Sequence, residues 1–247
     1  MDIYDTLILG SGYFSAGYAI ARGHCAILEE HQICDTGFYL PLRSFAHHPY
    51  EPVTEPGRHL AAILDELAVF RDGMQNTNAL ECAFCRFLIE REITPILKCR
   101  VIGIRKQADG ILDATVQTNE GLSHLYARRV LRTCPVGKKQ RMTLLFLTDD
   151  PDGIQKKLLA AFPGATLEPA YYPGRYALHL PTEGDDENSI KARVYHQWLA
   201  NGIPAKILYM APVFYPDGAV EEPSDAGFDN PVKALEAGYH YGREERL

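Results

Sequence analysis

The sequence predicts an α/β fold: a βαβ unit with a parallel sheet, an inserted three-stranded β-meander, and a smaller α+β second lobe. Three observations support this order of elements. An apolar strand pattern, a helix of small residues and a second strand follow one another over residues 5–29. Three strand-like segments separated by short turns occupy residues 96–134. Strand and helix patterns alternate again from residue 138, which indicates a separate lobe.

The first thirty residues predict the βαβ unit. Residues 5–10, DTLILG, alternate into an apolar run that ends at Gly10, as expected of a buried parallel strand that enters a tight turn. Residues 13–22 are rich in small side chains and predict a helix, and residues 25–29, CAILE, predict the second strand. This succession is typical of a Rossmann-like unit.

Two helices and the meander follow this unit. Pro56 opens an amphipathic helix with three leucines on one side. Asn78 and Glu81 have the spacing of a capping box, which predicts a helix from 78 to about 92. The segments ILKCRVIGIRKQ, ILDATVQTN and LSHLYARRVLRTC then predict a meander whose last strand returns to the parallel sheet.

The rest of the chain predicts a lobe and a tail. A Pro-, Gly- and Tyr-rich stretch is preceded by the predicted strand MTLLFL and helix GIQKKLLAAF, and followed by the predicted helix SIKARVYHQWLANG and strand AKILYMAPVF. After them the sequence is polar with Gly and Pro, so we expect an extended tail. The predicted domains are therefore 1–137 with the βαβ unit and meander, 138–216 with the second lobe, and 217–247 with the tail.

Composition excludes several classes of partner. The net charge is -7 and the 25 Lys and Arg residues are scattered, so we expect no nucleic-acid partner. The first residues carry acids and no basic leader, and the apolar runs fall short of the ~20 residues that span a bilayer. We therefore expect no membrane partner and a cytoplasmic location.

The six cysteines predict reduced thiols, because the chain is long and shows no signal peptide. Cys82 and Cys85 form a C-x-x-C inside a helical pattern without a second cysteine pair nearby. Helical projection places them with Ile89 on one apolar face, opposite a second apolar face. This pattern favours a helix buried on two sides over a metal or redox site, and we expect no metal centre.

The turn after the first strand favours phosphate binding. Gly10 and Gly12 allow a sharp turn and let a diphosphate approach main-chain N–H groups at the start of the next helix. Ser15 stands at the third position of the G-x-G-x-x-G pattern, where a small side chain still permits close helix packing. A side chain filling this hollow would count against the interpretation.

A carboxylate follows at the spacing that suits a ribose. Glu29 and Glu30 end the second strand, 19 and 20 residues after Gly10, where an acid accepts hydrogen bonds from an adenosine ribose. One of the two is expected to face the ligand. Strand, turn, helix, strand and terminal acid in register therefore predict a dinucleotide site.

In these motifs, and in the block from NALECAFCRF to YARRVLRT, the chain resembles the FAD-dependent oxidoreductases of the glutathione-reductase-like superfamily. It is also similar to a later strand of that family at QRMTLLF, and to a later helix and strand at RVYHQWLANGIPAKILYMAPVF. The resemblance therefore covers most of residues 5–216. It implies an FAD-binding oxidoreductase that holds the ADP part of the cofactor with the N-terminal turn. The implied cofactor-binding residues are Gly10, Ser11, Gly12, Ser15, Glu29 or Glu30, and Thr133.

The chain departs from the family at the flavin end. RTCPVGKK, residues 132–139, stands where the family has a longer flavin-contacting loop, and the family's C-terminal segment that completes the flavin site is expected to be missing. No catalytic residue is assigned from spacing. The interpretations left open are an oxidoreductase acting on an unidentified small molecule, as a homo-oligomer or with a complementary flavoenzyme subunit, and a non-catalytic descendant that binds a nucleotide weakly or serves protein interaction.

Overall fold

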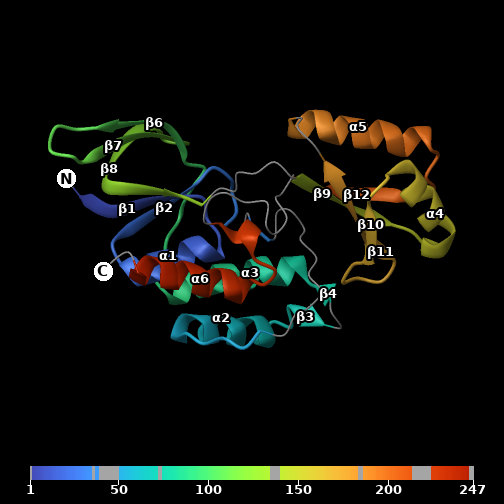
Figure 1. Ribbon diagram of the computed structural model, residues 1–247, viewed down its shortest axis with the longest axis horizontal. Coiled ribbons are helices and arrows are strands. Elements are labelled where there is room, and N and C mark those ends of the chain that lie inside the picture. Colours follow the sequence, from blue (N-terminus) through green and yellow to red (C-terminus); the bar gives the residue numbers. More distant parts are fainter. Residues whose placement is uncertain are drawn as a thin grey trace.

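The computed structural model describes residues 2–34, 37–38, 50–71, 74–133, 140–182, 186–212 and 224–244 of the chain. Figure 1 shows a sheet with blue, cyan, teal and red helices packed beneath it, and a second, smaller sheet with its own helices. This arrangement confirms the predicted α/β fold class with an additional lobe.

The larger sheet is mixed, and among the described residues its strand order is β5-β2-β1-β8-β7-β6. β1 pairs in parallel with both β2 and β8, and β6, β7 and β8 form the predicted antiparallel meander. The last meander strand is therefore also the strand that returns to the parallel sheet. The bounds are β1 Ile3–Leu9, β2 Cys25–Glu29, β5 Ile96–Leu97, β6 Arg100–Lys106, β7 Leu112–Thr118 and β8 Gly121–Arg132.

Alternation along β1 divides its side chains between two apolar clusters. Leu7 packs with Ala114 and Val116 of the meander, whereas Ile8 packs with residues of α1, such as Tyr18. The helices in this part of the chain are α1 Tyr13–Arg22, α2 Glu55–Glu66, α3 Thr77–Glu90 and α6 Pro231–Glu244. A short hairpin, β3 Phe70–Arg71 and β4 Met74–Gln75, lies between α2 and α3.

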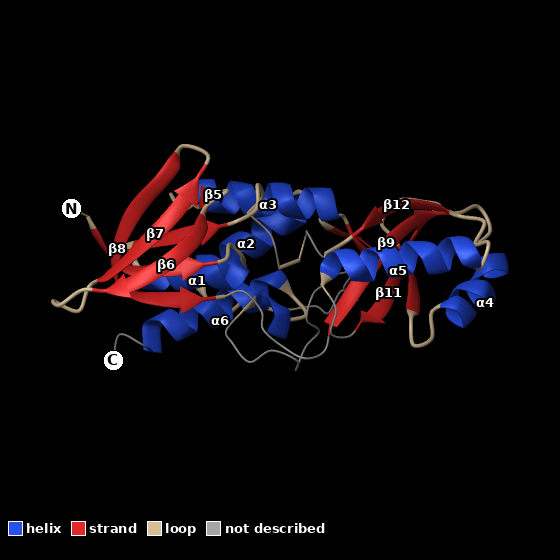
Figure 2. Cartoon of the chain, turned by 90° about the horizontal axis from the view of Figure 1, so that it is seen from above, coloured by secondary structure: helices blue, strands red, loops and turns tan. Residues whose placement is uncertain are grey.

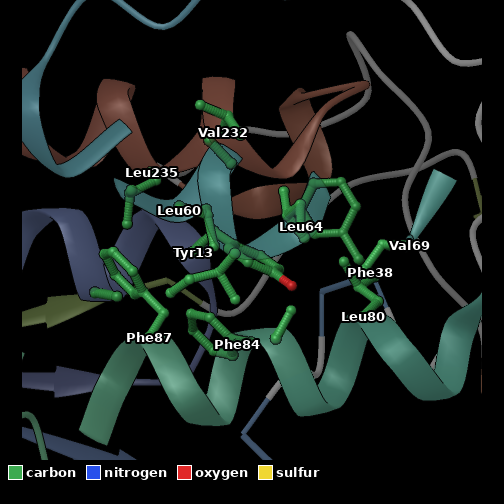
Figure 3. Close-up of a cluster of buried hydrophobic side chains, with 14 of the residues drawn as sticks. Tyr13, Phe38, Leu60, Leu64, Val69, Leu80, Phe84, Phe87, Val232 and Leu235 are labelled. Carbon is green, nitrogen blue, oxygen red and sulfur yellow. The ribbon is translucent and has the colours of Figure 1, made fainter. Parts of the chain in front are cut away.

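The four helices share one core. Tyr13 lies between Phe84 of α3 and Phe38, with ring centroids 4.1 and 5.3 Å from its own. Figure 3 shows these rings with Leu60 of α2 and Leu235 of α6 converging on the same space. Burial of this cluster holds α1, and therefore the turn before it, against the rest of the chain.

The structure corrects the predicted start of α3. The helix begins at Thr77, and its N-cap is Asn76, whose side-chain oxygen accepts a hydrogen bond from the N–H of Ala79 at 3.3 Å. Asn78 lies inside the first turn. Because β4 ends at Gln75, the chain can enter the helix two residues earlier than the Asn78–Glu81 spacing suggests.

The prediction that α3 is buried on two sides is wrong. Leu80, Phe84 and Phe87 are buried, but Cys82 is exposed and the side chain of Ile89 is 75% exposed. The face with Cys82 and Ile89 is open to solvent, whereas Cys85 is partly buried and forms a hydrogen bond with Cys34. Within the described residues, no three side chains that could bind a metal ion lie together.

The smaller sheet is antiparallel, with the order β10-β11-β9-β12 in the described part of the chain. Its elements are β9 Gln140–Leu147, α4 Pro151–Ala161, β10 Thr166–Pro169, β11 Arg175–Thr182, α5 Glu187–Ala200 and β12 Lys206–Met210. Side chains of α4 and α5 pack with one set of strand side chains around Phe146 and Trp198. Figure 2 shows both helices beside this sheet. The boundaries predicted near 137/138 and 216/217 lie outside the described residues.

The expectation of an extended tail, and of a missing segment that returns to the first domain, is wrong for residues 224–244. These residues form the 3₁₀ turn η1, Asp225–Gly227, and helix α6. Figure 1 shows α6 lying beside α1. Their backbones approach closely because Gly17 of α1 and Gly238 of α6 have no side chains: a Cβ on Gly238 would lie 2.7 Å from the carbonyl carbon of Phe14. The polar composition hid a helix whose buried residues include two glycines, an alanine and a glutamate beside Val232 and Leu235.

Across the described residues, no helix has the combination of length and apolar character that crossing a bilayer requires.

Candidate functional site

The turn between β1 and α1 is closed by main-chain and hydroxyl hydrogen bonds. Gly10 adopts a φ of 109°, which favours glycine, and its N–H donates to the carbonyl of Leu28 at 2.8 Å. The Ser15 hydroxyl lies 2.8 Å from the Gly10 carbonyl oxygen and 2.8 Å from the Thr133 hydroxyl. The Thr133 hydroxyl also lies 3.1 Å from the Gly10 carbonyl oxygen. Ser15 and Thr133 therefore fix the shape of the glycine turn.

Glu29 faces this turn, as predicted for one of the two acids. Its Oε2 accepts hydrogen bonds from the N–H of Ser11 at 2.8 Å and from the Ser11 hydroxyl at 3.0 Å. Its Oε1 accepts from the N–H of His31 at 2.9 Å and lies 2.6 Å from His31 Nδ1. Glu30, by contrast, is exposed. The parallel pairing of β1 with β2 brings the end of the second strand beside the turn.

The hydrogen bonds around Glu29 control its charge. Burial alone would raise the pKa of Glu29, but the hydrogen bonds donated by His31 and Ser11 outweigh it, so the pKa lies below its ordinary value. The hydrogen bond to Glu29 raises the pKa of His31. Glu29 is therefore an ionised, oriented acceptor at the position where the sequence predicts ribose binding.

The N-terminus of α1 holds an anion in this structure, and that anion belongs to the chain. The N–H groups of Tyr13 and Phe14 donate to Oδ2 and Oδ1 of Asp225 at 2.9 and 2.7 Å. Asp225 is buried in η1, at the opposite end of the sequence. The hollow predicted to receive a diphosphate is thus filled by a side chain, and this is the outcome that counts against the interpretation drawn from the turn. The sequence did not predict it, because no local pattern links residues 211 positions apart.

Glycines make the space that this carboxylate occupies. A Cβ on Gly12 or on Gly37 would lie 2.8 Å from Cγ of Asp225, closer than atoms can approach without movement. One turn thus brings together the predicted residues Gly10, Ser11, Gly12, Ser15, Glu29 and Thr133. Asp225 joins this set as an unpredicted member.

Solved structures identify the fold. No family model matches the sequence, and no curated protein matches it. The chain is similar to p-nitrophenol 4-monooxygenase PnpA from Pseudomonas putida DLL-E4, with 14% identity, a TM-score of 0.53, and coverage of 98% of this chain and 81% of that one. It has the fold of FAD-dependent hydroxylases.

Two further neighbours support the same fold. One is aklavinone-11 hydroxylase in a ternary complex with FAD and aklavinone, with 13% identity, a TM-score of 0.54, and coverage of 98% of this chain and 62% of that one. The other is OxyS anhydrotetracycline hydroxylase from Streptomyces rimosus, with 12% identity, a TM-score of 0.56, and coverage of 99% of this chain and 63% of that one. The chain therefore spans less than two thirds of the length of these two hydroxylases.

The residues at the turn fit the ADP part of FAD in their chemistry. The N–H groups of Tyr13 and Phe14 already bind an anion, so the carboxylate of Asp225 stands in for a phosphate. Glu29 is an ionised acceptor next to that anion site. The predicted flavin-contacting loop, with RTCPVGKK at its centre, lies largely outside the described residues, since 134–139 are not described.

Proposed function

We propose that the chain binds FAD, holding the ADP part at the N-terminal glycine turn, and acts as a flavin-dependent oxidoreductase on a small organic molecule. The observation that carries this proposal is the pairing of two sites at one βαβ crossover: amides of α1 that hold an anion, and a buried carboxylate beside them. The fold of the FAD-dependent hydroxylases supports the same assignment. We also assign the chain to the glutathione-reductase-like superfamily as part of this proposal.

Each residue of the turn has a defined role in this proposal. The N–H groups of Tyr13 and Phe14 would donate to the diphosphate, and the missing side chain of Gly12 would let it approach. Glu29 would accept from the ribose hydroxyls, held in place by Ser11. Bound FAD would supply the redox chemistry, while the protein would supply binding and orientation.

The names of the structural neighbours indicate a class of substrate. Their names describe hydroxylation or monooxygenation of p-nitrophenol, aklavinone and anhydrotetracycline. We therefore propose a planar aromatic compound as the class of substrate. A homo-oligomer or a complementary flavoenzyme subunit remains the proposed partner.

Calorimetric titration with FAD and with ADP tests the binding. We expect the wild-type chain to bind both, and Gly12→Val to weaken binding at least tenfold, because its side chain would occupy the space of the diphosphate. Gly103→Val is the matched control, since Gly103 lies in β6 with open space around its Cβ position. Far-UV circular dichroism confirms that each variant is folded. A wild-type chain that binds neither ligand, or a Gly12→Val variant that binds like the control, contradicts the proposal.

A further inference from the structure

Cys34 and Cys85 bring two thiols together from distant parts of the sequence. Cys34 follows β2 in an irregular segment, and Cys85 lies in the middle of α3. A hydrogen bond joins the two side chains, and both are partly buried. Cys34 also packs against the cluster that contains Phe84 and Leu88, which flank Cys85 on the helix. The packing of the helical core therefore holds the two thiols in contact.

This contact makes the two sulfurs chemically unequal. The hydrogen bond with Cys34 lowers the pKa of Cys85 to about 7, against the opposing effects of burial and of Glu81. The hydrogen bond with Cys85, together with burial and the nearby carboxylates of Glu81 and Glu29, raises the pKa of Cys34. Cys34 therefore keeps its proton, while a large fraction of Cys85 is thiolate at neutral pH. The thiolate is the form of cysteine that reacts with an oxidant.

We propose that Cys85 and Cys34 are a redox pair, in which hydrogen peroxide oxidises Cys85 and Cys34 then closes a reversible disulfide. The thiolate sulfur of Cys85 attacks one peroxide oxygen, the O–O bond breaks, and hydroxide leaves as Cys85 becomes a sulfenic acid. The sulfur of Cys34 then attacks the Cys85 sulfur, the S–O bond breaks, and the departing oxygen takes the Cys34 proton to leave as water. Two electrons thus pass from the two sulfurs to one peroxide molecule.

The fold allows this disulfide to close between two elements. A disulfide requires the sulfurs to approach to ~2.05 Å, closer than a hydrogen bond holds them. Cys85 is fixed by α3, but Cys34 lies outside the helices and strands, so its segment can supply the movement. Cys82 is exposed one helical turn before Cys85, whereas Cys85 is the residue in contact with Cys34. The structure therefore favours a cross-link from Cys34 to Cys85 over one within the C-x-x-C of α3.

The cross-link ends beside the glycine turn. The carbonyl of Cys34 accepts a hydrogen bond from the hydroxyl of Ser11, and the same hydroxyl donates to Glu29. Oxidation therefore ties the segment that follows β2, next to the turn, to α3. The redox pair needs no bound nucleotide, so its test is independent of the proposed function.

Peptide mapping of the folded chain after treatment with hydrogen peroxide tests the pair. Trypsin leaves Cys34 in residues 23–43 and Cys85 in residues 72–86. Because these two peptides also contain Cys25 and Cys82, the double variant Cys25→Ser/Cys82→Ser is mapped beside the wild type. We expect the two peptides to be joined in both proteins and to separate after reduction with dithiothreitol. Peptides that stay separate while Cys85 is oxidised, or that are joined in the wild type only, overturn the inference.

Cys34→Ser, added to the double variant, is the matched control. It leaves Cys85 in place and removes only the sulfur that closes the disulfide. We expect peroxide to stop at the sulfenic acid of Cys85, so that dimedone traps about tenfold more of it than in the double variant. Equal trapping with and without Cys34, or no trapping at Cys85 in either protein, overturns the inference. Far-UV circular dichroism confirms that each variant is folded, and the wild-type map tests the cross-link without any substitution.

Discussion

The substitution Gly238→Ala tests the close crossing of α1 and α6 that brings the C-terminal segment to the glycine turn. A Cβ at this position would lie 2.7 Å from the carbonyl carbon of Phe14 and 2.9 Å from its Cα, both backbone atoms that cannot rotate away. The first distance falls short of an ordinary 3.4 Å contact by about 0.7 Å, so the helices must separate. Overpacking of this kind costs up to about 3 kcal/mol, and the higher helix propensity of alanine offsets about 1 kcal/mol.

We therefore expect Gly238→Ala to lower the free energy of unfolding by about 2 kcal/mol. Urea denaturation followed by far-UV circular dichroism measures this change. Fluorescence of Trp198, the only tryptophan, reports separately on the smaller sheet because Trp198 lies in that core. Gly103→Ala, at an open position in β6, is expected to stay within about 0.5 kcal/mol of the wild type. A Gly238→Ala variant as stable as this control would refute the close helix crossing.

Three further predictions concern buried or paired groups. Glu236→Gln is expected to lower the free energy of unfolding by about 2 kcal/mol, because the Glu236 carboxylate accepts hydrogen bonds from both the N–H and the hydroxyl of Thr54, the N-cap of α2. A urea denaturation curve identical to that of the wild type would contradict this. The pKa of Glu29 is lowered, so the stability that Glu29 adds is lost as pH falls through that lowered pKa. The pKa of His31 is raised, so the stability that His31 adds is lost as pH rises through that raised pKa. His31→Ala should therefore lose most stability at a pH between the two pKa values, and a loss that stays constant as pH rises through the pKa of His31 would argue against the pair. The hydrogen bond with Cys34 lowers the pKa of Cys85 to about 7, so the rate at which Cys85 is alkylated should rise with a midpoint near that pH. Cys34→Ala should shift this midpoint upward. An unshifted midpoint would show that the hydrogen bond with Cys34 does not lower the pKa.

The sequence predicted the parts of the fold that depend on local pattern. The run ending at Gly10, the small-residue helix and the strand ending at Glu29 form one continuous βαβ unit, and their spacing carries the prediction. The meander could also be predicted, because the turn sequences ADG and NEG separate its strands. Glu29 reaches the turn because parallel pairing of β1 with β2 fixes where the second strand ends.

Long-range contacts explain what the sequence did not predict. Asp225 lies in a polar segment with Gly and Pro, and its partners Tyr13 and Phe14 are more than 200 residues away. Helix α6 buries Ala234, Gly238, Gly242 and the charged Glu236, which carry little apolar signal in a sequence profile, and only Val232 and Leu235 as large apolar residues apart from Pro231. Its fit against α1 comes from close backbone approach at Gly238, a property of the folded pair and not of either helix alone.

A crystal structure of the protein with ADP tests the central claim most directly. The account predicts that the diphosphate accepts hydrogen bonds from main-chain N–H groups at the glycine turn and that the ribose hydroxyls donate to Glu29. ADP bound away from this turn at full ligand occupancy would contradict it.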